Sequence, residues 1–326
     1  MDSLIFSLNA VLPIVAMVAV GYMLRRIGFI NADFAKMANK LVFRLFLPTM
    51  LFLNVYKIEA DMNIGITYIL FAMAAIAVIF FLAILLVRFA TKEPTRRAPI
   101  IQSVFRSNYA LIGIPLASAF GGDEGEAVAA LLSAFSIPLF NIMAVITFAV
   151  FADGEKPNVK KTLKNIITNP LIIAVALGAL FLLSKNALAN VGITTTLMDI
   201  TVINKILTYL SGLATPLALI VLGAQFEFSA IPGMKREIIF STAMRVFIVP
   251  AVVITVAVIT GLFGSAHIAA FVALFATPVA VSTVPMTQEL GGDAKLAGQL
   301  VVWTTLFSGV TIFLFAFILK EIGVFV

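Results

Sequence analysis

The feature that most constrains this chain is a succession of long apolar runs over nearly its whole length. A helix needs about 20 mainly apolar residues to cross the hydrocarbon core of a bilayer, so about ten such spans fit into 326 residues. Hydrophobic residues make up 62% of the sequence, charged residues only 12%, and the mean hydropathy is +1.12. A soluble domain carries about 25% charged residues. We therefore predict an all-α integral membrane protein with lipid as its solvent.

The predicted spans follow the apolar runs, and short polar connections separate them. The first run follows Asp2 and precedes Arg25 and Arg26, which reverses the charge order of a signal peptide, so we expect it to be retained. The expected spans are 4–24, 37–56, 63–89, 99–121, 126–152, 168–184, 205–226, 237–263, 266–288 and 296–319.

Basic residues gather in alternate connections, which predicts the orientation of the chain. Lysine and arginine accumulate on the cytoplasmic side of a membrane protein. Alternate connections carry most of the cations, whereas those between them carry mainly acids, such as Asp123 and Glu124. We expect a bacterial-type inner membrane with both termini outside and no nucleic-acid partner. The cation-rich connections hold Arg25, Arg26, Lys36 and Lys40; Lys92, Arg96 and Arg97; Lys156, Lys160, Lys161 and Lys164; and Lys235 and Arg236.

The sequence offers little for an enzyme. It contains no cysteine and one histidine, His267, which argues against disulfides, thiolate chemistry and most zinc sites. We find no paired aspartates in facing spans. We therefore expect no catalytic residue, no metal and no cofactor.

The two halves of the chain resemble each other. Pro13 to Gly21 in the first span has the proline-to-glycine spacing of Pro170 to Gly178 in the sixth. Spans two and seven share Leu47-Pro48-Thr49 and Thr215-Pro216-Leu217, and spans four and nine share Pro115 and Pro285 at the same distance before a Gly-Gly-Asp. Because five spans is an odd number, the second half would be inverted. The predicted division is a first five-helix repeat at 1–152, a cytoplasmic linker at 153–167 and a second, inverted repeat at 168–326.

Inverted repeats place a binding site near the midplane, where discontinuous helices meet. Proline removes a backbone donor and clashes with the preceding turn, so we expect Pro115, Pro278 and Pro285 to open spans four and nine inside the bilayer. Backbone groups freed at this depth persist only where they are buried in protein or line a wet cavity. The half-helices that begin after the breaks would direct partial positive charge towards it, which favours an organic anion.

Several polar side chains near these breaks are candidate ligands. Asn108 is the first choice, since an unpaired buried amide costs about 1–3 kcal/mol. Asn141 is interpreted as a contact between helices, and we expect Arg44, Arg106 and Arg245 either to reach the cytoplasmic face or to steer anions. The proposed substrate-binding set is Asn108, Pro115, Ser282, Thr283, Pro285, Gln225 and Asn54.

The segment from Asn108 to Pro115, Asn-Tyr-Ala-Leu-Ile-Gly-Ile-Pro, resembles span four of the auxin efflux carrier family. That family includes plant auxin exporters and bacterial proteins described as malonate transporters. Val284-Pro285 resembles its span-nine break, and Asn169-Pro170 resembles the opening of its second half. The resemblance covers the whole chain and implies ten helices in two inverted repeats, with Asn108 and Pro115 at the substrate site, and an elevator-type movement. The short linker at 153–167 and the upstream position of Pro278 depart from the family pattern.

The leading hypothesis is a secondary transporter of small organic anions, either mono- or dicarboxylates of malonate or auxin type. The alternatives are a sodium-coupled symporter of the bile acid symporter type and a channel, since a pore can also use broken helices. The sequence leaves H⁺ or Na⁺ coupling and a homodimer open.

Overall fold

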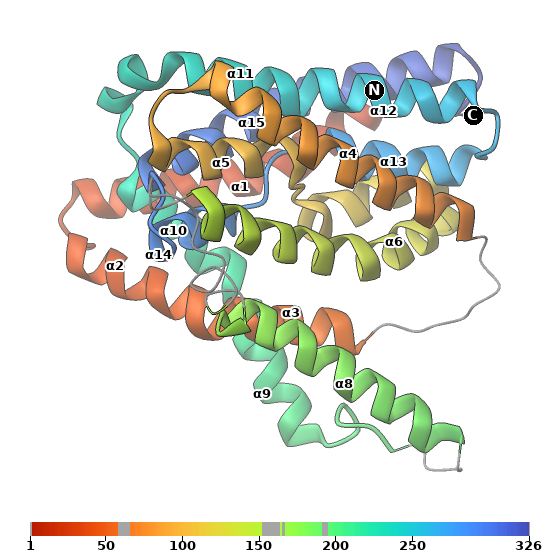
Figure 1. The fold of residues 1–326 in the computed structure, drawn as a ribbon, viewed down its shortest axis with the longest axis horizontal. Coiled ribbons are helices and arrows are strands. Elements are labelled where there is room, and N and C mark those ends of the chain that lie inside the picture. The colour runs from red at the N-terminus through yellow and green to blue at the C-terminus, as the bar shows by residue number, and fades with distance from the viewer. Residues whose placement is uncertain (1, 58–65, 152–163, 165–166, 191–194, 326) are drawn as a thin grey trace.

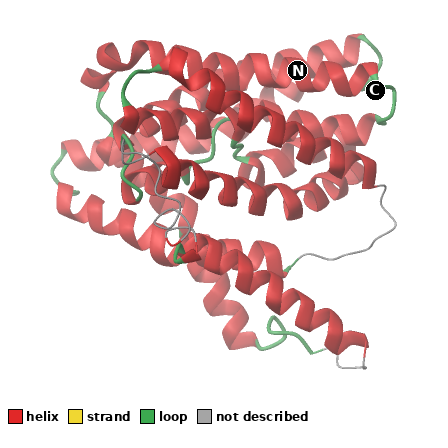
Figure 2. Cartoon of the chain, viewed as in Figure 1, coloured by secondary structure: helices red, strands yellow, loops and turns green. Residues whose placement is uncertain are grey.

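The computed structural model describes residues 2–57, 66–151, 164, 167–190 and 195–325, and these residues form an all-helical protein without a named strand (Figures 1 and 2). Apart from Lys164 and Ile167, the predicted linker at 153–167 lies outside the described residues. The first half contains α1 (Asp2–Arg26), α2 (Ala32–Leu41), α3 (Leu47–Tyr56), α4 (Ile66–Ala90), α5 (Pro94–Phe105) and α6 (Ile114–Phe151). The second half contains α8 (Pro170–Asn190), α9 (Thr201–Gly212), α10 (Ala214–Gln225), α11 (Lys235–Ala243), α12 (Val249–Ile259), α13 (Ser265–Ala276), α14 (Thr283–Glu289) and α15 (Ala294–Glu321).

Long apolar helices confirm the predicted class of an all-α membrane protein. The outer surface carries large apolar side chains, such as Phe81 on α4 and Ile259 on α12, which are 62% and 78% exposed. A surface of this kind suits lipid and not water. Of the described stretches, seven are long and apolar enough to cross a membrane, and Ser265–Ala276 is a shorter apolar helix. The prediction of ten spans stays a prediction. The seven are Ala32–Tyr56, Ile66–Ala90, Tyr109–Phe151, Pro170–Ala189, Thr201–Gln225, Phe228–Ile259 and Ala294–Glu321.

Three prolines widen their helices instead of breaking them. A π-helical turn lies directly before the α-helix that contains Pro48, Pro115 or Pro250 near its start. In each case the residue before the proline donates its N–H to the carbonyl five residues earlier, as Ile114 does to Tyr109. The wider turn accommodates the proline ring and the missing donor, so the chain stays helical. The expectation that Pro115 opens span four is therefore wrong.

The interruption of that span lies upstream, at Arg106–Asn108, between the end of α5 and the π-helical turn Tyr109–Gly113. The second interruption runs from Thr277 to Ser282, between α13 and α14. Pro278 lies within it, and Thr277 is extended (φ −71°, ψ 154°), as the residue before a proline prefers. Pro285 was also predicted as a break, but it lies inside α14, where the first turn of a helix tolerates proline.

The two interrupted segments cross. Ser107 and Val279 form an antiparallel bridge, and the Asn108 N–H donates to the Pro278 carbonyl oxygen at 2.8 Å. Each non-helical segment thus satisfies backbone groups of the other, as a medium without water requires. α5 has 12 residues and rises about 18 Å, so it is too short to cross a hydrocarbon core about 30 Å thick before its break.

Glycines allow two helix pairs to approach closely. α1 packs against α10, and α3 packs against α8. A Cβ on Gly223 of α10 would lie 1.9 Å from the Val18 carbonyl oxygen, and one on Gly178 of α8 would lie 2.9 Å from that of Phe52. We call α1, α2, α3, α8, α9 and α10 the paired group, and α4, α5, α6 and α11 to α15, which surround the crossing, the crossing group.

The connections sort to two ends of the molecule. Figure 1 marks both chain ends on the right, where α12 leads to α13, whereas the α1–α2 and α4–α5 connections lie on the left. The Gly-Gly-Asp motifs also end helical segments. Gly122 (φ 60°) divides α6, and Gly291 (φ 83°) precedes Asp293, which caps α15 by accepting from the Leu296 N–H at 3.0 Å.

The α1–α10 contact predicts a large difference between two identical substitutions. Gly223→Ala should lower the melting temperature of the detergent-purified protein, because overpacking costs about 1–3 kcal/mol and the close atom belongs to the backbone. Gly212→Ala is the matched control, since no atom lies within 4 Å of its Cβ position. Equal melting temperatures for the two variants would contradict this packing.

Candidate functional site

Arg245 holds the two interrupted helices together from within the protein. Its side chain is 0% exposed, and each acceptor that the described residues offer it is a backbone carbonyl. The acceptors are Thr277 (2.8 Å, from Nε), Leu274 (3.0 Å) and Val104 (3.3 Å). These carbonyls lie at the C-terminal ends of α13 and α5, where helices leave acceptors unsatisfied and carry partial negative charge. We had expected Arg245 near the cytoplasmic face, and it instead caps both half-helices at their break.

Arg106 occupies the crossing itself, at the end of α5, and is 4% exposed. One terminal nitrogen donates to Gln102 Oε1 at 3.0 Å and contacts Met286 Sδ. The other donates to Asn141 Oδ1 at 2.6 Å and to Ser282 Oγ at 2.8 Å. Every one of these acceptors is electrically neutral. Arg106 therefore links α5, α6 and α14 while its positive charge stays uncompensated by them.

The carboxylates that pair with cations lie elsewhere. Among the described residues, the ion pairs join Arg96 to Glu237 and Asp293, Arg44 to Glu289, and Lys295 to Glu227. None of these pairs includes Arg106 or Arg245. A buried charge without a partner is expensive, and in a membrane protein it usually marks a functional site.

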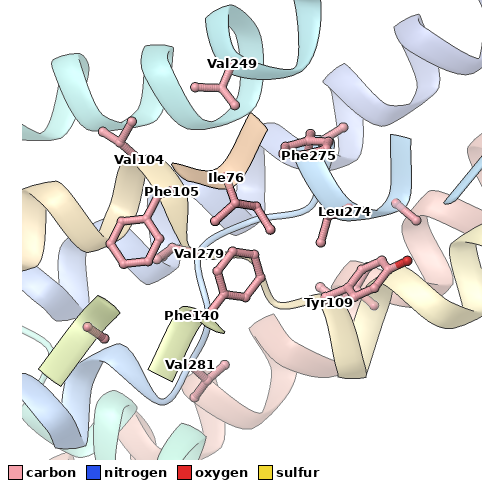
Figure 3. Packing of buried hydrophobic residues seen from close by; sticks show 14 of the residues in the cluster. Ile76, Val104, Phe105, Tyr109, Phe140, Val249, Leu274, Phe275, Val279 and Val281 are labelled. Atoms are coloured by element: carbon pink, nitrogen blue, oxygen red, sulfur yellow. The ribbon is translucent and has the colours of Figure 1, made fainter. Parts of the chain in front are cut away.

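A cavity of about 50 Å³ adjoins Arg106. Since one water needs about 10–15 Å³ of such space, it could hold a few waters or a small head group. Residues of α3 and α8 form one wall, and the crossing and α6 form the other, so the cavity lies between the paired and the crossing groups. In Figure 3, Phe140 lies beside the extended segment that carries Val279 and Val281, and Tyr109 lies nearer to Leu274. The lining residues are Leu47, Met50, Leu51, Asn54, Arg106, Ser107, Asn108, Tyr109, Ala110, Ile137, Phe140, Asn141, Leu171, Ala280 and Ser282.

None of the described residues accepts a hydrogen bond from the Asn108 side-chain amide. Its Nδ2 is buried and unpartnered, although the backbone of Asn108 is bonded to Pro278. Leaving a buried donor unsatisfied costs about 1–3 kcal/mol. A cation and an unpaired amide donor on one cavity are suited to an incoming acceptor that carries negative charge.

The structure brings together three of the residues proposed from the sequence and separates the others. Asn108, Ser282 and Asn54 line the same cavity. Thr283 and Pro285 are buried in α14 outside its lining. Pro115 is exposed and does not line the cavity. Gln225 lines a different pocket.

Arg106 and Asn141 are site residues that the sequence pattern did not single out. A fourth span that begins at residue 99 predicts Arg106 near a membrane face. The helix in fact begins at Pro94, a residue suited to the first position of a helix. That signal could have placed Arg106 at mid-membrane. Asn141 does contact another helix, as expected, but it does so through Arg106 at the cavity.

Two larger pockets flank α14, with volumes of about 770 and 750 Å³. The first is lined by residues of α1, α10 and α15 and includes Arg25, Arg26, Gln225 and Lys295. The second includes Arg44, Asn169 and Glu289. Both are lined by residues of the paired and of the crossing groups, and neither shares a lining residue with the central cavity.

A comparison with protein families finds one described as "Membrane transport protein", whose model matches residues 6–316. The match covers nearly the whole chain. A comparison with curated proteins finds no match.

The position of Arg245 predicts a strong effect on stability. Arg245→Met should lower the melting temperature of the purified protein markedly, because each buried carbonyl left unpaired costs about 1–3 kcal/mol. Arg88→Met is the control, since Arg88 is exposed on α4. The carbonyl-capping role would be refuted if the two variants melted at the same temperature.

Proposed function

This chain belongs to the membrane transport protein family, which includes the auxin efflux carriers, and from that premise we propose that it is a secondary transporter of small organic anions. The resemblance found in the sequence is thereby confirmed, and the protein is a membrane transporter. Substrate class, mechanism and sidedness belong to our proposal.

One observation carries the choice of an anion. Arg106 is buried at a cavity without a carboxylate partner, and the Asn108 amide beside it lacks an acceptor. Charge-assisted hydrogen bonds from guanidinium to carboxylate are about twice as strong as neutral ones. A carboxylate would accept from both residues and neutralise the guanidinium. In this state the cavity of about 50 Å³ would admit the carboxylate head group, and the body of the acid would lie along Leu51, Phe140 and Leu171 once the paired and the crossing groups move apart.

The helix pairing supports two inverted repeats. The first span contains α1 and the sixth contains α8, whereas the second ends with α3 and the seventh ends with α10. If the first span corresponds to the sixth and the second to the seventh, an inversion axis relates the α1–α10 contact to the α8–α3 contact. Both contacts are present, and each uses the glycine that ended the matching Pro-to-Gly segment. Gly21 lies against Ile220, and Gly178 lies against Phe52. Two interrupted helices that cross between such repeats are typical of secondary transporters.

The position of the cavity supports an elevator-type movement. Its two walls belong to different groups of helices, because Asn54 and Leu171 lie in the paired group and Arg106 and Asn108 lie in the crossing group. Sliding the crossing group along the paired group would carry the anion from one side to the other. We propose a bacterial-type inner membrane with both termini outside, since the basic α1–α2 and α4–α5 connections lie at the end opposite the chain ends (Figure 1).

The proposal predicts saturable uptake that depends on Asn108. Radiolabelled malonate and indole-3-acetate represent a dicarboxylate and a monocarboxylate, and we expect at least one to enter proteoliposomes with a measurable KM. Asn108→Ala should raise that KM about 10–100-fold, because a hydrogen bond to a charged group contributes about 1.5–3 kcal/mol. Asn108→Asp should abolish uptake, since it places a negative charge beside the anion.

Asn186→Ala is the matched control, because Asn186 is exposed on α8 and should leave KM unchanged. Uptake that does not saturate would favour a channel, and uptake that requires a sodium gradient would favour the symporter alternative. An unaltered KM in Asn108→Ala would remove Asn108 from the site.

A further inference from the structure

The crossing contains two buried arginines, and their charges are balanced differently. We infer that the unbalanced charge of Arg106 makes this protein an exchanger. The crossing group moves faster with an anion bound than without one, so an anion that it carries on its return movement speeds the transport cycle. This inference rests on the proposed function, because it requires the anion to bind beside Arg106. It concerns the mode of transport, which the family assignment leaves open.

The charge of Arg245 is balanced within the protein. Its donors go to carbonyls at the C-terminal ends of α5 and α13. A helix C-terminus is equivalent to about half a negative elementary charge, so two of them offset one guanidinium. Arg245 is also 0% exposed and does not line the cavity, which leaves no route for a ligand to reach it.

The charge of Arg106 has no such balance. Its acceptors are an amide of Gln102, an amide of Asn141, a hydroxyl of Ser282 and the sulfur of Met286. Neutral acceptors hold the guanidinium in place but leave a full positive charge on the cavity wall. Among the described residues, no lining residue of this cavity is acidic.

Arg106 moves with the crossing group. Its own helix is joined to the other interrupted segment by the Asn108–Pro278 hydrogen bond, by the Ser107–Thr277 hydroxyl contact at 2.7 Å and by Arg245. The facing wall, which includes Asn54 and Leu171, belongs to the paired group. Movement of one group past the other therefore carries the guanidinium, which is 4% exposed, along the facing wall of the paired group.

An empty crossing group would make this passage with an unpaired charge, and a group loaded with a monovalent anion would make it as a neutral pair. Moving a charge into a low-dielectric environment is costly, whereas a hydrogen-bonded ion pair recovers much of that cost. The loaded movement should therefore be faster in both directions. Exchange of one anion for another should exceed net flux, in which the crossing group must return empty.

The test compares two kinds of proteoliposome at pH 7.5, preloaded with unlabelled acid or empty, using radiolabelled indole-3-acetate and radiolabelled malonate as probes. We expect initial uptake of the monovalent indole-3-acetate to be at least about tenfold faster into preloaded vesicles, the factor that a barrier difference of about 1.4 kcal/mol produces. With a potassium diffusion potential set by valinomycin, its exchange rate should stay unchanged, because the loaded group is neutral. Exchange of divalent malonate should respond to the potential.

Variants of Arg106 separate charge from packing. Arg106→Gln should bring the ratio of preloaded to empty uptake close to one and raise KM, whereas Arg106→Lys should retain a high ratio. Arg88→Gln removes an exposed arginine and should leave the ratio unchanged. Should Arg106→Gln fail to fold, the wild-type ratio and its response to potential still decide the matter.

Each failure has its own signature. Saturable uptake at equal rates into both kinds of vesicle would overturn the exchange inference and leave the proposed function standing. Absence of uptake of both probes from both kinds of vesicle would overturn the proposed function and the inference together. A monovalent exchange rate that follows the potential would show that the loaded group carries charge, which also refutes the inference.

Discussion

The backbone of a membrane-embedded helix can be interrupted only where something else satisfies the freed hydrogen-bonding groups, and here Arg245 meets that requirement. Its single guanidinium donates hydrogen bonds to carbonyls of both interrupted helices, because α5 and α13 end beside each other. The second contribution is mutual, as Asn108 and Pro278 pair their backbones across the crossing. The cavity depends on these contacts, because without them the backbone groups at the interruptions would be left unpaired in an apolar environment.

The two arginines show how the same residue type takes different roles from its surroundings. Arg245 meets helix C-termini, whose partial charges balance it, and it is sealed inside the protein. Arg106 meets neutral amides, a hydroxyl and a sulfur, and it adjoins a cavity. The first arrangement stabilises the fold, and the second leaves a charge for a ligand to neutralise. This difference lies in the partners that the fold supplies and is invisible in the residues alone.

The prolines in the sequence did not reliably predict where helices are interrupted. Pro48, Pro115 and Pro250 each follow a π-helical turn that absorbs the missing donor, so the helix continues past them. Pro278 does lie in an interruption, and Pro285 does not. A proline excludes one hydrogen bond and one backbone conformation, but a helix can respond by widening, kinking or stopping. Which response occurs depends on the neighbouring helices that can satisfy the freed carbonyls. Asn108, whose amide needs partners in any apolar setting, lines the cavity, and its role as a ligand stays a prediction.

The amino-acid sequence was enough to predict the lipid environment of this protein, its helical class, its family and the presence of polar side chains that need partners in an apolar environment. These follow from hydropathy, from span length and from a local motif, all of which are read along the chain. The folded structure was needed to show where the helices stop, that Asn54 and Ser282 join Asn108 while Gln225 and Pro115 do not, and that the described residues offer Arg106 no carboxylate partner. Those outcomes depend on contacts between residues far apart in the chain, and the free energy of a buried charge or an open carbonyl is set by such contacts and not by its sequence neighbours.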